Sequence, residues 1–152
     1  MIINFEKCIA IGAAALVVTR ESVAQAKGLT PVARIAGMSA HAQDPKLFTT
    51  APVGAIEKLL KKPGWSMDEV DLFEVNEAFA CVAMFAMHDL GIPHDKINVN
   101  GGATALGHPI GASGSRIIVT LLAALNARGA KKGIASLCIG GGEGTAVAVE
   151  LI

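Results

Sequence analysis

Apolar residues follow two different spacings along the chain, and segments with the two spacings alternate. Short runs rich in β-branched residues predict strands at residues 13–20, 31–41, 70–75, 133–141 and 144–152. Apolar residues three and four positions apart, together with glycines that close helices, predict helices at residues 21–28, 50–64, 76–91 and 113–129. The segment at 76–91 is apolar nearly all round, so we expect a buried helix there.

The order of these segments predicts the class of fold. Strands and helices alternate three times and two further strands follow, which is typical of an α/β layered sheet. The last two strands are joined by the short run GGGEG at residues 140–144, which predicts a hairpin-like connection between antiparallel strands. We therefore expect one α/β domain with a mixed sheet. A capping-box sequence at residues 66–69 and a short extended piece at 97–100 complete the pattern.

Composition narrows the classes of function. The chain has 152 residues, enough for one domain, and its 13 basic and 13 acidic residues leave no net charge. No basic stripe is present, which argues against a nucleic-acid partner, and no apolar run approaches the roughly 20 residues that span a membrane. Apolar residues make up 52% of the chain and charged residues only 17%, so we expect another chain or domain to cover one face.

The three cysteines, Cys8, Cys81 and Cys138, form neither an even set nor a CxxC pair. This argues against a disulfide framework and for reduced thiols in a cytoplasmic protein. An apolar run at residues 8–18 leaves secretion open as an alternative, because it has the length of a signal-peptide core. Against that alternative, an acidic residue beside the preceding lysine cancels the positive charge expected before such a core.

Three residues with chemically active side chains lie at similar places in this pattern. Asn76 follows a strand directly, His108 lies in a glycine-rich loop before a helix, and Cys138 ends a strand. Reactive groups in α/β proteins gather at the carboxyl ends of strands, and the bare backbone of nearby glycines can cradle an oxyanion or phosphate. Each residue also has a purely structural interpretation: a helix cap for Asn76, a polar surface group for His108 and a small core residue for Cys138.

Other known site patterns are missing from the sequence. The glycines fit neither of the two common phosphate-loop motifs, and GASGS at residues 111–115 does not fit the motif of a serine nucleophile. No cluster of histidines and carboxylates predicts a metal site.

Three motifs resemble the C-terminal half of the thiolases, which are acyl-CoA C-acyltransferases. These motifs are NEAFA at residues 76–80, NGGATALGHPIGASG at 100–114 and CIGGGEGTA at 138–146, in family order and with family spacing. The motif NEAF, rather than one of the HDCF type, argues against the sterol-carrier branch. The resemblance implies a three-layer α/β/α thiolase-type domain at residues 12–152, here with a mixed five-stranded sheet, after an atypical lead-in at 1–11.

The resemblance also implies roles for single residues. His108 would activate a nucleophilic cysteine and help to bind the thioester oxygen. Cys138 would be the acid and base for the proton on the α-carbon, which led us to expect an accessible and easily ionised thiol. Asn76 would hold a water that forms an oxyanion hole with His108. Preorganised donors and a nearby base are what enolate formation from a thioester requires.

Further residues and the substrates follow from the same resemblance. The Gly140 N–H would contribute to a second oxyanion hole, and Ala78 and Phe79 would line the acyl pocket. The substrates would be coenzyme A thioesters such as acetoacetyl-CoA or another 3-ketoacyl-CoA, formed or cleaved by acyl transfer, with no separate cofactor and no metal.

The sequence departs from the family pattern at several positions, and these departures leave two alternative functions open for the chain. Ile11 stands where the family has an aspartate before GAAA, and KLFTTAPVGA keeps only part of a GPxPA motif, at Pro52 and Ala55. Nothing here resembles the family half that carries the nucleophilic cysteine, so we expect the chain alone to be inactive. The chain is then the C-terminal catalytic half of a thiolase or a non-catalytic remnant or assembly domain.

Two kinds of partner protein are expected. A separate N-terminal thiolase half would supply the nucleophile. Alternatively, two copies would form a homodimer, or a higher oligomer built from it, through the apolar helix at residues 76–91, because a single sheet covers only one side of that helix.

Overall fold

The computed structural model describes residues 11–152. Its strands are β1 (Ala33–Ala42), β2 (Leu72–Val75), β3 (Lys132–Ile139) and β4 (Glu143–Leu151). Its α-helices are α1 (Glu21–Ala26), α2 (Ala51–Leu60), α3 (Ala80–Leu90), α4 (Ala103–Leu106) and α5 (Ser113–Arg128). Short 3₁₀ turns, η2 (Pro45–Thr50), η3 (Met67–Glu69) and η4 (His94–Lys96), link these elements. The predicted α/β class is confirmed.

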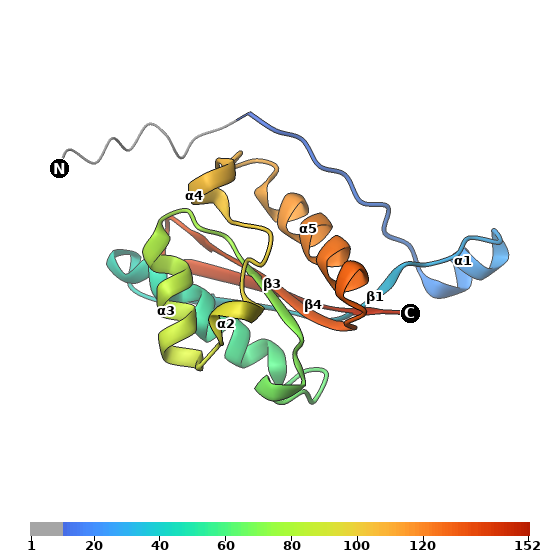
Figure 1. Cartoon of the computed structure of the whole chain (residues 1–152), viewed down its shortest axis with the longest axis horizontal. Coiled ribbons are helices and arrows are strands. Elements are labelled where there is room, and N and C mark those ends of the chain that lie inside the picture. Colours follow the sequence, from blue (N-terminus) through green and yellow to red (C-terminus); the bar gives the residue numbers. More distant parts are fainter. Residues whose placement is uncertain (1–10) are drawn as a thin grey trace.

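The sheet is mixed and lies between two helical layers (Figure 1). The strand order is β1-β4-β3-β2, with β2 parallel to β3 and β4 antiparallel to both of its neighbours. Helices α2 and α3 pack on one face around a core that includes Ile56, Phe73 and Ile134, and α5 packs on the other face around Leu72 and Leu121. The three-layer α/β/α architecture and the antiparallel hairpin are therefore confirmed.

The number of strands was predicted wrongly. The described sheet has four strands, because residues 13–20 form no strand and run in an extended path outside the sheet (Figure 1). Val17 is 94% exposed there. Strand propensity reflects how well side chains fit a pleated surface with neighbours on both sides, and this segment has no such neighbour among the described residues. Beside β2, Ile97 forms an isolated parallel bridge to Phe73, at the short extended piece predicted from residue 97.

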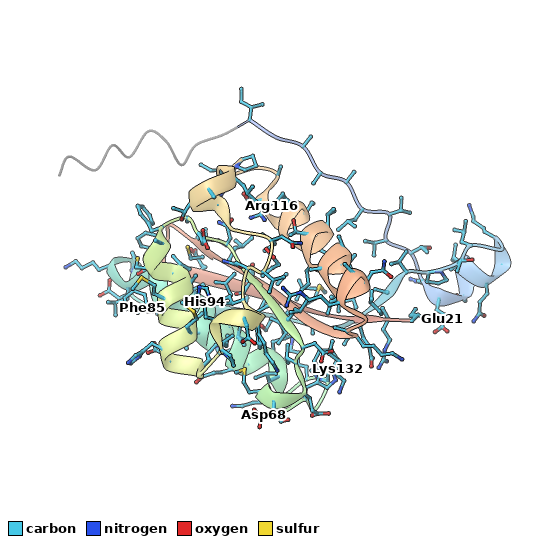
Figure 2. The ribbon with its side chains drawn as sticks, viewed as in Figure 1. Glu21, Asp68, Phe85, His94, Arg116 and Lys132 are labelled. Carbon is cyan, nitrogen blue, oxygen red and sulfur yellow. The ribbon has the colours of Figure 1, made fainter. Side chains whose placement is uncertain are left out.

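Helix α3 begins later and is less buried than its sequence predicts. Asn76 was expected to open this helix, but its backbone N–H donates to Ser136 O and so continues the pairing of β2 with β3. Only one side of α3 faces the core, through small or branched residues such as Val82. On the other side Met84 is 61% and Phe85 is 37% exposed, and Phe85 lies on the outer side of the helix (Figure 2).

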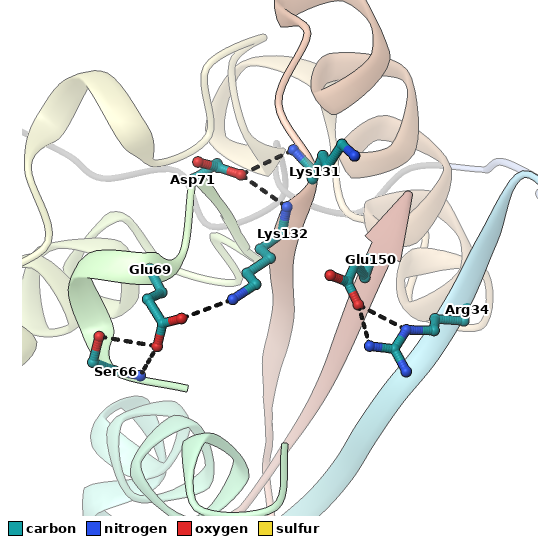
Figure 3. A network of polar contacts seen from close by, with 7 residues as sticks. All are labelled: Arg34, Ser66, Glu69, Asp71, Lys131, Lys132 and Glu150. Atoms are coloured by element: carbon teal, nitrogen blue, oxygen red, sulfur yellow. Dashed lines mark hydrogen bonds and ion pairs between the residues drawn. The ribbon is translucent and has the colours of Figure 1, made fainter. Parts of the chain in front are cut away.

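Polar contacts fix the edge of the sheet where β2 and β3 begin (Figure 3). The Asp71 carboxylate accepts hydrogen bonds from the backbone N–H groups of Lys131 and Lys132, at 2.9 and 2.8 Å. The predicted capping box is confirmed: Glu69 accepts from the Ser66 N–H at 2.8 Å and pairs with Lys132 at 2.9 Å. The Ser66 N–H and the Lys132 charge lower the pKa of Glu69 to about 2. At the far edge, Arg34 of β1 pairs with Glu150 of β4 (Figure 3).

Gly144 provides a test of how closely α2 approaches the sheet. A Cβ atom at Gly144 would lie 2.5 Å from the backbone carbonyl of Ala51, at the start of α2. Because backbone yields less easily than a flexible side chain, we expect Gly144→Ala to lower the free energy of unfolding by about 1–3 kcal/mol, measured by urea denaturation. Gly140→Ala is the matched control, since a Cβ there meets no atom within 4 Å. Equal stability of the two variants would contradict this packing.

Candidate active site

The structure brings Asn76 and His108 together at the carboxyl end of β2. Asn76 is 1% exposed and its Nδ2 lies 3.5 Å from His108 Nε2, at the outer limit of a hydrogen bond. His108 stands in the loop between α4 and α5, directly after Gly107, whose φ of 91° favours glycine. The turn at Gly107 thus directs the chain so that the imidazole meets the strand end, as the sequence pattern predicted for these two residues.

On the side of the imidazole away from Asn76, a contact with Ser113 determines which ring nitrogen carries the proton. His108 Nδ1 lies 2.6 Å from Ser113 Oγ, and the Ser113 hydroxyl donates to Pro109 O at 3.1 Å. A hydroxyl has one proton to donate, so a Ser113 hydroxyl that donates to Pro109 O accepts from Nδ1–H. The neutral ring therefore carries its proton on Nδ1 and leaves the Nε2 lone pair facing Asn76. A ring in this tautomer can accept a proton at Nε2.

A buried ion pair lies behind Asn76. Arg116 lies in the first turn of α5 (Figure 2) and donates from Nη2 to Asn76 Oδ1 at 3.3 Å. The Arg116 Nη1 lies 3.6 Å from Oε2 of Glu74, a residue of β2 that is 1% exposed. Burial raises the pKa of Glu74 to about 7, although the Arg116 charge opposes this shift. Burial and the positive charge of Arg116 lower the pKa of His108, so its imidazole is neutral at physiological pH.

A second group of polar residues holds the glycine-rich loop against the strand end. The Asn98 carboxamide accepts from the Val75 N–H and donates to the Val75 carbonyl, both at 2.8 Å. The same amide donates to Glu77 Oε1 at 2.9 Å, and Glu77 Oε2 accepts from the Thr104 N–H at 3.1 Å. A Cβ at Gly102 would collide with the Glu77 carboxylate, so a side chain there would displace that carboxylate from its position.

These supporting residues were missed by the sequence analysis. Arg116, Ser113, Asn98 and Glu77 all lie inside or beside the quoted motifs, yet each is a common polar residue with no distinctive spacing. One weak signal was available for Asn98, since asparagine takes up a positive φ more readily than most residues, and its φ is 47°.

Cys138 lies in a different environment from the one we expected. Its side chain belongs to the core on the α2 and α3 face, only 8% of the residue is exposed, and burial raises the pKa of its thiol. The expectation of an accessible, easily ionised thiol was therefore wrong, because a strand end that is covered by helices is desolvated. Cys81, which lies in the helix that we expected to be buried, is partly exposed, and Cys8 lies outside the described residues. Within residues 11–152, no hydrogen bond joins Cys138 to His108 or Asn76.

The remaining predicted site residues lie near the same end of the sheet. Gly140 occupies the exposed turn between β3 and β4, next to Cys138 in the chain. Ala78 and Phe79 form the bend between β2 and α3, where the Phe79 ring packs edge-on against Phe48 with centroids 5.9 Å apart. Over the described part of the chain, no three histidine, cysteine or carboxylate side chains are grouped so that they could hold a metal ion. No helix in that part is both long enough and apolar enough to cross a membrane.

The buried Glu74 carboxyl predicts a pH dependence of stability. Its pKa in the folded chain, about 7, lies above the ordinary 4.5, so the folded state binds this proton more tightly than the unfolded state. The stability that the proton supplies is present below pH 4.5 and is lost as the pH rises towards 7. Relative to the unmodified chain, Glu74→Gln should therefore gain about 2–3 kcal/mol of unfolding free energy across that range.

Urea denaturation at both ends of the pH range measures this gain. Glu57→Gln, which replaces an exposed carboxylate on α2, is the matched control. A difference between Glu74→Gln and the unmodified chain that stays constant with pH would show that Glu74 is ionised throughout.

A family model and several relatives match most of the chain. The sequence model of the thiolase C-terminal domain matches residues 29–151. Acetyl-CoA acetyltransferases from Thiocystis violacea and Escherichia coli are 53% and 52% identical over 139 residues, which is 91% of this chain and 35% of each relative. The cytosolic acetyl-CoA acetyltransferase of mouse is 48% identical over the same length.

Solved structures give the same result. The crystal structure of the acetyl-CoA acetyltransferase of Bacillus anthracis superimposes with a TM-score of 0.84 at 48% identity, over 87% of this chain and 34% of that one. Human mitochondrial 3-ketoacyl-CoA thiolase gives a TM-score of 0.84 at 45% identity, over 87% of this chain and 33% of that one. The chain thus spans about a third of the length of the relatives that it matches. It belongs to the thiolase family, and residues 29–151 match the C-terminal domain of that family.

Proposed function

We propose that this chain supplies the thioester-binding and proton-transfer part of a thiolase active site. The reaction would be acyl transfer between acyl-CoA thioesters, which forms or cleaves acetoacetyl-CoA or another 3-ketoacyl-CoA. The observation that carries the proposal is the contact of Asn76 Nδ2 with His108 Nε2, in a ring whose Nδ1 proton is held by Ser113. This arrangement presents one amide donor and one basic nitrogen to the same small volume, as enolate chemistry requires. Coenzyme A thioesters would be the substrates, with no separate cofactor.

Asn76 and His108 would act on the acyl group and its thioester oxygen. His108 Nε2 would take the proton of a nucleophilic thiol, after which the protonated ring and a water held by Asn76 Nδ2 would donate to the thioester oxygen. Because the pKa of His108 is lowered, the ring is unprotonated and ready to accept that proton. The tautomer set by Ser113 keeps this capacity on the nitrogen that faces Asn76.

Cys138 would transfer the proton at the α-carbon. A thiol with a raised pKa keeps its proton at neutral pH, which suits it to protonate the enolate that leaves when a 3-ketoacyl chain is cleaved. In the opposite direction the same thiolate would have to form next to the bound thioester. The Gly140 N–H would donate to the second thioester oxygen, and Ala78 and Phe79 would line the acyl pocket.

A partner would complete the active site. Because the chain matches about a third of each relative, we propose that the nucleophilic cysteine and further contacts to coenzyme A come from a separate N-terminal thiolase half. The exposed apolar side of α3, with Met84 and Phe85, is the surface proposed to receive this half or a second copy of the chain. The free thiols of Cys81 and Cys138 suit a reducing, cytoplasmic location. The second candidate function is a non-catalytic assembly domain, which the same apolar surface would also serve.

Thiolysis of acetoacetyl-CoA tests the proposal. We expect no turnover by the chain alone, and turnover when it is mixed with the part of the Escherichia coli acetyl-CoA acetyltransferase that it does not match. His108→Ala should lower kcat in the mixture by about 10²–10⁴-fold, because it removes the proton acceptor. His94→Ala, which replaces an exposed histidine in η4, is the matched control. Turnover by the chain alone would place a nucleophile within it, and a folded but inactive mixture would favour the assembly domain.

The apolar side of α3 predicts self-association in the absence of a partner half. Single copies would expose Met84 and Phe85, so we expect light scattering to show a homodimer or a larger oligomer at micromolar concentration. Met84→Asp should weaken this association, because it places a charge in the interface. Val119→Asp, on an exposed position of α5, is the control for the added charge alone. A stable monomer would contradict the predicted oligomer.

A further inference from the structure

We infer that Arg116 is a positioning residue that keeps the Asn76 carboxamide turned so that its Nδ2, rather than its oxygen, faces His108. Among the described residues, Arg116 is the group that donates to Asn76 Oδ1, at 3.3 Å from Nη2. A carboxamide rotated by half a turn would place its NH₂ group against the guanidinium, so that two donors would face each other. The guanidinium therefore selects one of the two orientations of the amide. The consequence for catalysis rests on the proposed function, whereas the orientation itself does not.

This orientation controls the ring nitrogen that would take up a proton. With Nδ2 towards the ring, a proton on His108 Nε2 would face the amide protons across 3.5 Å. With the opposite orientation, Asn76 Oδ1 would accept a hydrogen bond from that same Nε2–H and would stabilise the charged ring. Arg116 thus favours the neutral, proton-accepting ring in two ways, through its own charge and through the amide that it orients.

The surroundings of Arg116 show that stability alone does not explain it. Its Nε and Nη1 atoms are buried without a hydrogen-bond partner, and so is Glu74 Oε1. The two side chains attract one another at 3.6 Å, but their geometry leaves three buried polar atoms unsatisfied, which is costly. A pair of apolar side chains would fill this space at lower cost. The hydrogen bond to Asn76 Oδ1, at 3.3 Å, is the contact that such a replacement would lose.

The charged groups near the imidazole are few in the described structure. The positive charge of Arg116 on α5 lowers the pKa of His108 directly. Glu74 on β2 lies behind Arg116. Glu77 follows Asn76 in the chain and accepts a hydrogen bond from Asn98 in the loop. A test must therefore separate the charge of Arg116 from its effect on the amide. A double-mutant cycle does this, because the orientation effect needs Asn76 and the charge effect does not.

The experiment follows the tautomer and pKa of His108 in the folded chain by ¹⁵N NMR. All variants carry Glu74→Gln, so that no buried carboxylate loses its partner. We expect Nδ1 to be the protonated nitrogen of the neutral ring, and Arg116→Met to raise the pKa of His108 by about one unit. In an Asn76→Leu background the same change should raise it by less than half as much. Arg128→Met, which removes the same charge from the exposed end of α5, is the matched control and should leave the pKa unchanged.

Two results would overturn the inference. One is an equal rise in pKa with and without Asn76, which would leave only the charge of Arg116. The other is a neutral ring protonated on Nε2. If the variant with all three changes fails to fold, hydrogen exchange of the Asn76 side-chain amide answers the same question. Exchange should quicken when Arg116→Met is added to Glu74→Gln, and unchanged exchange would refute the inference. None of these measurements needs acyl transfer, so they test the orientation of Asn76 independently of the proposed reaction.

Discussion

The double hydrogen bond between the Asn98 carboxamide and the backbone of Val75 is the contact on which the site depends. It uses two backbone groups on the edge of β2 that faces away from β3, and so extends with a side chain the pairing that Ile97 and the Asn98 N–H make with Phe73. The loop that it anchors leads to Gly102 and, through α4, to His108. Because Glu77 binds both Asn98 and the start of α4, the loop is fixed at Val75 in β2 and at Glu77, on either side of Asn76. Hydrogen bonds made by Asn98 and Glu77, rather than by Asn76 or His108, therefore set the distance between the Asn76 amide and the His108 imidazole.

The sheet divides the candidate catalytic residues between its two faces. Glu74 of β2 and Asn76, directly after β2, contact Arg116 of α5, whereas Cys138 of β3 packs in the core under α2 and α3. Side chains on opposite faces can act on one substrate only beyond the ends of the strands, where the sheet no longer separates them. Gly140 and Gly141 lie at this point, in the exposed turn that follows Cys138 and Ile139. This geometry explains why the chain combines a polar network on one face with a desolvated thiol on the other.

Much of the fold could be predicted from sequence because it depends on local patterns. The long helix α5 ends where Gly129 takes up a left-handed conformation with φ of 63°, and the capping box at Ser66 forms as its residue types indicate. The segment at 13–20 shows the limit of such patterns, since a strand also needs a partner that composition does not reveal. The same limit applies to the site. Asn76 and His108 could be singled out, but the pKa of Cys138 depends on helices folded over it, and the role of Arg116 depends on contacts across 40 residues.

The buried arginine shows how function and stability differ in this chain. An interior with so few charges gains most of its stability from apolar packing, and the two cores on either side of the sheet supply that packing without Glu74 or Arg116. The ion pair therefore adds a cost that the fold could avoid. What it provides is a fixed direction for one carboxamide, which in turn faces the one imidazole whose tautomer is set by Ser113. A site that must bind a developing negative charge requires donors whose direction does not change during the reaction. The contacts that run from Glu74 through Arg116 and Asn76 to His108 serve that requirement, because they hold the carboxamide in one orientation.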